Sequence, residues 1–138
     1  MSRMYDNLRR RGEELGIVFG DLTLLSNSRL ALEASEYARD MGKHGIFHEN
    51  MFHAYFTKAT DIGNFKVLSL IATKCGLDVE DMMNTLRDHR YKPRLDEARK
   101  EGEKINLTGV PTFIINNKYK IVGAQPIEVF TDLFEKLP

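Results

Sequence analysis

Residues 108–113 read Thr108-Gly109-Val110-Pro111-Thr112-Phe113 and mark the point where helical patterning changes to extended patterning. Before them, residues 92–104 carry a charged helical pattern, with Pro93 in the first turn, where proline is tolerated. After them, residues 112–115 form a continuous apolar run, residues 116–118 have turn composition, and residues 119–122 are apolar again. This order predicts a β-hairpin that begins directly after the proline.

The first strand of this hairpin is apolar on both faces. Such strands normally lie inside a sheet that is covered on both sides. Only one other short apolar run, residues 17–19, could supply a further strand. Either the sheet is very small, or its other strands come from elsewhere. A final helix is predicted to begin at Pro126, with an apolar stripe that we expect to be buried: Phe130, Leu133, Phe134 and Leu137.

The first two thirds of the chain have helical periodicity. Residues 2–15 form a charged helix that Gly16 ends, and Asn27 is placed to cap a helix that runs to about residue 43. A helix over residues 45–58 follows. Asn64 and Asp78 are predicted to cap two further helices, the first of which ends at Gly76. The chain is therefore expected to be mostly helical, with a small β-structure near its C-terminus.

The composition is that of one soluble globular domain over residues 1–138. Twenty basic and twenty acidic residues cancel, which gives no general attraction to nucleic acid or to anionic membranes. No apolar stretch is long enough to span a bilayer, and no signal-peptide pattern is present, so we expect a cytoplasmic protein. The single cysteine, Cys75, excludes an intramolecular disulfide.

The order of these features resembles the DsbA-like thioredoxin-fold family, in particular its FrnE-like dithiol-disulfide isomerases. Six stretches carry the resemblance and together extend over nearly the whole chain: residues 27–34, 47–56, 61–63, 76–78, 108–113 and 123–126. The resemblance implies an α/β, mostly helical, partial thioredoxin-like fold. It also implies a helical insertion at about 27–106 and a C-terminal ββα half at 107–138.

Family members carry their Cys-x-x-Cys motif in a first βαβ unit, and no counterpart of that unit is found in this sequence. The resemblance further implies a cis Val110–Pro111 bond in a loop that holds an extended substrate strand, with Gly109, Val110, Pro111 and Thr112 as the binding residues. The alternative is that the proline only shapes the start of the strand.

Three further residues are candidates for a cleft. Asn27 and Arg29 occupy a region that approaches the active site in the related glutathione-using kappa and 2-hydroxychromene-2-carboxylate isomerase branch. The alternative is a helix cap and a surface arginine. Gln125 lies in the Gly-Ala-Gln-Pro turn, which lacks the aspartate of that branch, so glutathione binding is disfavoured and no cofactor is predicted.

No catalytic residue is predicted. Cys75 falls on the apolar stripe near the end of its helix, where the helix dipole disfavours a thiolate. His48 and His53 resemble a zinc motif, but their five-residue spacing turns the two rings about 140° apart around a helix. His44, four residues before His48, is expected to precede the helix. No metal site is therefore predicted.

These observations leave three functions open. The first is a DsbA-like or FrnE-like thiol-disulfide oxidoreductase homologue that acts on an extended peptide or protein thiol but has no redox activity alone, since exchange needs an attacking and a resolving cysteine. The second is a non-catalytic binding or assembly module, a homodimer formed through an exposed sheet edge or a complex in which a separate chain supplies the βαβ unit. The third is a glutathione-dependent isomerase or transferase.

Overall fold

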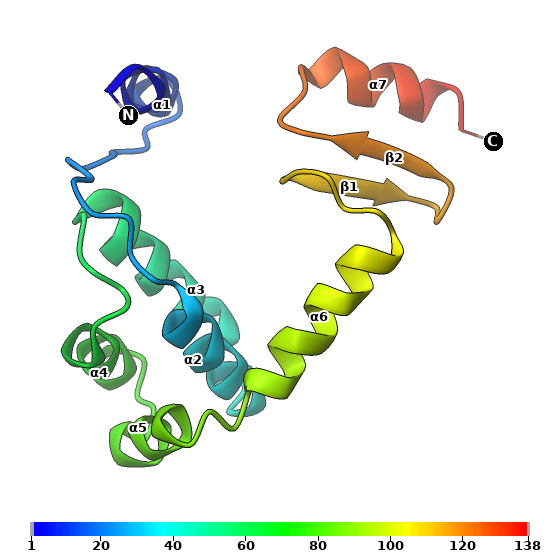
Figure 1. Ribbon diagram of the computed structural model, residues 1–138. Helices are drawn as coiled ribbons and strands as arrows, with labels where there is room; N and C mark the ends of the chain where they lie inside the picture. Colours follow the sequence, from blue (N-terminus) through cyan, green and yellow to red (C-terminus); the bar gives the residue numbers. More distant parts are fainter. Residues whose placement is uncertain (1, 138) are drawn as a thin grey trace. The chain divides into compact units, whose positions relative to one another are not determined.

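The fold is described from a computed structural model, which describes residues 2–137. Figure 1 shows its helices and its β-hairpin: α1 (Ser2–Glu14), α2 (Arg29–Asp40), α3 (His44–Phe52), the π-helical segment η1 (His53–Thr57), α4 (Phe65–Lys74), α5 (Val79–Arg87), α6 (Lys92–Lys104), β1 (Thr112–Ile115), β2 (Tyr119–Val122) and α7 (Ile127–Glu135). The chain divides into two compact units, residues 1–95 and residues 96–138. The expected boundary between residues 106 and 107 stays a prediction.

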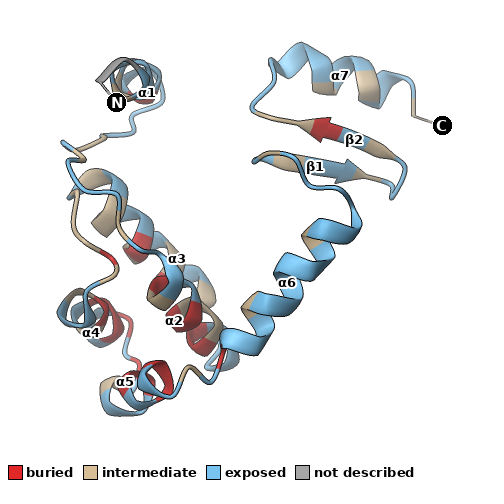
Figure 2. Cartoon of the chain, viewed as in Figure 1, coloured by how far each residue is buried: buried red, intermediate tan, exposed pale blue. Residues whose placement is uncertain are grey.

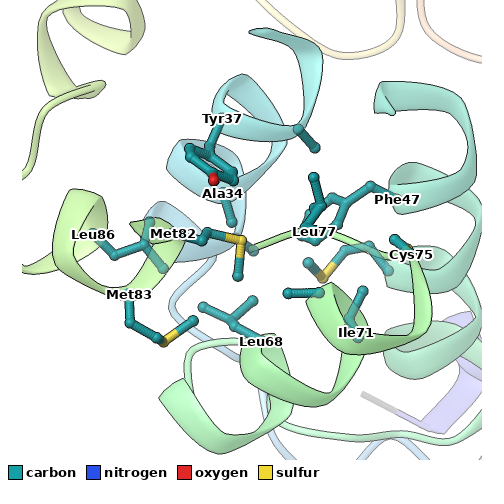
Figure 3. Close-up of a cluster of buried hydrophobic side chains, with 14 of the residues drawn as sticks. Ala34, Tyr37, Phe47, Leu68, Ile71, Cys75, Leu77, Met82, Met83 and Leu86 are labelled. Carbon is teal, nitrogen blue, oxygen red and sulfur yellow. The ribbon is translucent and has the colours of Figure 1, made fainter. Parts of the chain in front are cut away.

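The core of the first unit lies between α2, α3, α4 and α5, which carry the buried positions in Figure 2. Its largest fully buried side chains include Tyr37, Phe47, Leu68, Met82 and Leu86, and Figure 3 shows them converging from these helices. Removing such side chains from water is the main stabilising contribution to this unit.

Local capping chemistry sets the starts of α4 and α5, as the sequence predicts. The Asn64 side chain accepts a hydrogen bond from Lys66 N over 2.8 Å, and Asp78 Oδ1 accepts one from Asp81 N over 2.9 Å. The left-handed φ of +65° at Gly76 ends the turn after α4. At α2 the capping position is Ser28, but Asn27 Oδ1 accepts the hydrogen bond from Arg29 N over 3.1 Å.

Two expectations for this unit are wrong. Residues 17–19 form no strand, because Ile17 N bonds to Gly12 O at the end of α1 and Gly20 N bonds to Phe56 O. His44 does not precede the helix but is the first residue of α3. Its ring stacks on that of His48, with centroids 5.3 Å apart.

The second unit contains the predicted hairpin and final helix. β1 and β2 pair antiparallel, with Thr112 opposite Val122 and Ile115 opposite Tyr119, and the turn between them uses positive φ at Asn116 and Asn117. Burial in this unit is lower than expected. Phe113 and Ile114 in β1 are 39 % and 44 % exposed, and Phe134 in α7 is 55 % exposed.

No helix within residues 2–137 combines the length and apolar character that crossing a bilayer requires.

Candidate functional site

The loop at residues 109–112 leads directly into β1. The Val110–Pro111 peptide bond is cis, and Thr112 Oγ1 donates a hydrogen bond to Gly109 O over 2.6 Å, which closes the loop on itself. The Val110 side chain is 82 % exposed. Within the described chain, the backbone N–H and C=O of Val110 have no hydrogen-bond partner.

The hydrogen-bond pattern of the hairpin shows which backbone groups of β1 remain available. Gly123 N donates to Pro111 O over 2.7 Å, so these two residues form a hydrogen-bonded pair. Such pairs alternate along an antiparallel ladder, which places the next ones at Phe113 and Ile115. The N–H and C=O groups of Thr112 and Ile114 therefore point away from β2.

We refer to Val110, Thr112 and Ile114 as the open edge of β1. Among residues 2–137 no strand other than β2 pairs with β1, so these backbone groups form a ladder without a partner strand. On the face of the hairpin that α7 covers, the Phe113 ring packs edge-on against Phe130, with centroids 5.0 Å apart. The open edge is thus held by a hairpin that its own helix supports.

Gln125 belongs to the same unit but does not extend the open edge. Its Nε2 donates to Val122 O over 2.9 Å and thereby closes the turn between β2 and α7. Gly123, which begins this turn, has a φ of +86°, a backbone conformation that residues with a Cβ rarely adopt. In this structure Gln125 is therefore a turn-forming residue.

Cys75 is the residue on which any thiol chemistry of these 138 residues would depend, and it is 4 % exposed at the C-terminal end of α4. Figure 3 places it among the core side chains. Burial raises the pKa of the thiol, while the charges of Lys43 and Lys74 lower it by less. A buried thiol with a raised pKa is a poor nucleophile. The burial of Cys75 is what its place on the apolar stripe predicted.

Asn27 and Arg29 lie in the first unit, at the start of α2. Both line a hollow of about 390 Å³, together with side chains from the chain around α4 and from the end of α5. Arg29 is more than a surface arginine: its Nη2 lies 3.2 Å from His89 Nε2, and its Nε lies 3.6 Å from an oxygen of the buried Glu33.

Glu33 and His89 were not predicted from the sequence as members of this hollow's surroundings. Glu33 carried one local signal, since it lies four residues after Arg29 and four before Tyr37, on the apolar side of α2. His89 carried no such signal, because it meets Glu33 only through the packing of α5 on α2. Within residues 2–137, no three His, Cys, Asp or Glu side chains gather in a way that could hold a metal ion.

The model of the DSBA-like thioredoxin domain family matches residues 1–135. The chain belongs to this family. The DSBA-like chain is also 28 % identical, over 127 residues, to the uncharacterized protein YwbO of Bacillus subtilis, a match that covers 90 % of this chain and 63 % of that protein.

Among solved structures, the DSBA-like chain is similar to a probable DsbA oxidoreductase, SCO1869, from Streptomyces coelicolor. The TM-score is 0.82 at 24 % identity, over 96 % of this chain and 60 % of the other. At this identity the likeness concerns the fold. The DSBA-like chain spans about three fifths of the length of each of these two proteins.

Proposed function

We propose that this chain is a DsbA-type, FrnE-like thiol-disulfide oxidoreductase homologue that holds an extended polypeptide strand but performs no dithiol-disulfide exchange by itself. Membership of the DSBA-like family supports the proposed relationship to thiol-disulfide oxidoreductases. The proposed lack of exchange activity is supported by the single, buried cysteine, because exchange requires an attacking thiolate and a resolving thiol.

The observation that carries the docking role is the open edge of β1. The unpaired backbone groups of Thr112 and Ile114, continued by the exposed Val110, have the spacing that an added β-strand needs. Main-chain hydrogen bonds give such binding its affinity with little dependence on sequence, which suits a protein that handles many polypeptides. Gly109 and Pro111 contribute by shaping the loop that presents Val110.

Binding of a fluorescently labelled, unfolded peptide with its cysteines alkylated tests this role by fluorescence anisotropy. Ile114→Pro removes one N–H from the open edge without removing a donor to β2, and we expect it to weaken binding about tenfold, the equivalent of one lost hydrogen bond at the upper end of its usual strength. The control Ile127→Ala removes an apolar side chain that is 68 % exposed on α7. Equal affinity of wild type and Ile114→Pro would argue against docking at this edge.

A second candidate function is a homodimeric binding module, in which two open edges of β1 pair with each other. It is favoured by the exposed apolar side chains of the second unit, Phe113, Ile114 and Phe134, because an unpaired apolar edge promotes association. Sedimentation velocity at micromolar concentration should then give a dimer that Ile114→Pro dissociates. A wild-type protein that remains monomeric would exclude this arrangement at that concentration.

A further inference from the structure

The first two turns of α3 carry two histidines that lie one helical turn apart. His44 and His48 are separated by four residues, and because His44 is the first residue of α3, both belong to one continuous helix. Side chains with this spacing lie one above the other on the same helix face. Their rings are accordingly neighbours, with centroids 5.3 Å apart and planes inclined by 27°. With His44 inside the helix, the two imidazoles can reach a common metal ion.

The separation of the two rings suits a shared ion. A zinc ion lies about 2.0–2.1 Å from an imidazole nitrogen, which places it about 3.2 Å from the centroid of that ring. Two rings that bind one zinc ion can therefore have centroids up to about 6.4 Å apart. The observed 5.3 Å lies within this limit. A turn of each ring about its Cβ–Cγ bond, a torsion with broad minima, aims one nitrogen of each ring at a common point.

Neighbouring side chains restrict the two rings. The His48 ring packs against Phe52, with centroids 4.1 Å apart, and Phe52 in turn packs edge-on against Phe56, with centroids 5.5 Å apart. On the other side, Arg39 Nη2 lies 3.5 Å from His44 Nε2. A guanidinium can only donate, so His44 Nε2 is the acceptor and carries a lone pair. A metal ion would bind this same lone pair, in competition with Arg39.

The donor atoms select the kind of metal. Imidazole nitrogen suits zinc, copper and nickel, whereas calcium and magnesium prefer oxygen ligands. Within residues 2–137, no third His, Cys, Asp or Glu side chain completes the pair. An ion held by two side chains keeps open coordination positions, unlike the closed sites with four protein ligands that stabilise folds. Both rings are partly exposed, so an ion can enter and leave from solvent.

We infer that His44 and His48 form an exchangeable surface site for a divalent transition metal ion of the zinc, nickel and copper group, with water in the remaining coordination positions. The site is separate from the open edge of β1 and does not involve Cys75. The competing explanation is that the two rings only continue the row of stacked side chains along this helix face, where Phe52 and Phe56 follow at the same four-residue spacing. Phenylalanine at positions 44 and 48 would serve such a row equally well, and substitution therefore separates the two explanations.

Titration of the full chain with zinc chloride, followed by NMR of the histidine ring signals, tests this inference. Zinc has no redox chemistry and therefore leaves Cys75 unoxidised. We expect the ring signals of His44 and His48 to shift together and to saturate, while those of His53 and His89 stay in place. Magnesium chloride at the same concentrations should shift none of them. Absence of saturable shifts with zinc, or a shift of only one ring of the pair, would overturn the inference.

Variants that remove one ligand each locate the binding. In a chelate the second bond forms at a high effective concentration, so His44→Gln and His48→Phe should each weaken zinc binding about a hundredfold. His48→Phe keeps an aromatic ring against Phe52, and its thermal unfolding without metal shows whether the fold is intact. The matched control is His53→Gln, at an exposed position at the start of η1, which should bind zinc like the wild type. Unchanged zinc affinity in either ligand variant would overturn the inference.

Arg39 provides a test in the opposite direction. Arg39→Ala removes the donor that competes for His44 Nε2 and also removes a positive charge near the site. We therefore expect this variant to bind zinc several-fold more tightly than the wild type in the same titration. A row of rings with a purely structural role predicts no such gain. Unchanged or weaker zinc binding in Arg39→Ala would contradict the assignment of His44 Nε2 as a metal ligand.

Discussion

The core of the helical unit offers a matched pair of leucines on one helix. Leu68 has no exposed surface, whereas Leu70, two residues later on α4, is 70 % exposed. Leu68→Ala removes Cγ and both methyl carbons from the core, which costs about 2.4 kcal/mol in transfer free energy at ~0.8 kcal/mol per carbon. The residual cavity adds to this cost, and buried leucines lose about 2.7–5.0 kcal/mol in total. We expect about 3 kcal/mol for Leu68→Ala and less than about 0.5 kcal/mol for Leu70→Ala.

Cys75 reports on this loss of stability directly. Its thiol is 4 % exposed in the same cluster, so a disulfide reagent reaches it only when the cluster opens. If that opening is the unfolding of the helical unit, 3 kcal/mol accelerates labelling roughly a hundredfold. Labelling of Cys75 reports on the helical unit alone. A signal from the whole chain would combine the unfolding of two compact units and could not be treated as one two-state transition. Similar labelling rates in the two leucine variants would refute the assignment of Cys75 and Leu68 to one closed core.

Two further predictions concern single hydrogen bonds. Burial and the hydrogen bond to Asp81 raise the pKa of Tyr37 to about 12. The stability that depends on the neutral phenol is therefore intact below pH 10 and is lost as the pH rises toward 12. In Tyr37→Phe, urea unfolding curves measured across that pH range should lack this additional loss of stability. Asn64→Ala should cost about 1 kcal/mol because it removes the cap of α4, whereas Ser28→Ala, at a capping position without a side-chain hydrogen bond, should cost little. Equal costs in these two variants would contradict the capping assignment.

Residues that act through their own neighbours could be predicted from the sequence. Asn64 and Asp78 cap helices, and Asn116 and Asn117 form the hairpin turn, because each uses backbone groups within three residues or a φ that its side chain tolerates. The helices of the first unit, the hairpin and the final helix followed from the same local signals.

Features that depend on long-range packing could not be predicted in the same way. The run at 17–19 has strand composition, but Ile17 N donates to Gly12 O and the following Gly20 N donates to Phe56 O in η1, so neither pairs with a strand. The apolar strand β1 suggested burial on both faces, yet Phe113 and Ile114 keep more than a third of their surface exposed. The pair of Glu33 and His89 is separated by 56 residues and arises only when α5 packs on α2.

Reduction of insulin disulfides by dithiothreitol, with and without the purified chain, tests the central claim most directly. The claim is that these 138 residues hold a polypeptide strand but lack the pair of thiols that exchange requires. We predict that insulin is reduced at the uncatalysed rate, that Cys75→Ser does not change this result, and that thioredoxin in the same assay accelerates the reaction. Acceleration by the wild-type chain that is lost in Cys75→Ser would contradict the claim, because the buried thiol would then be the reactive group.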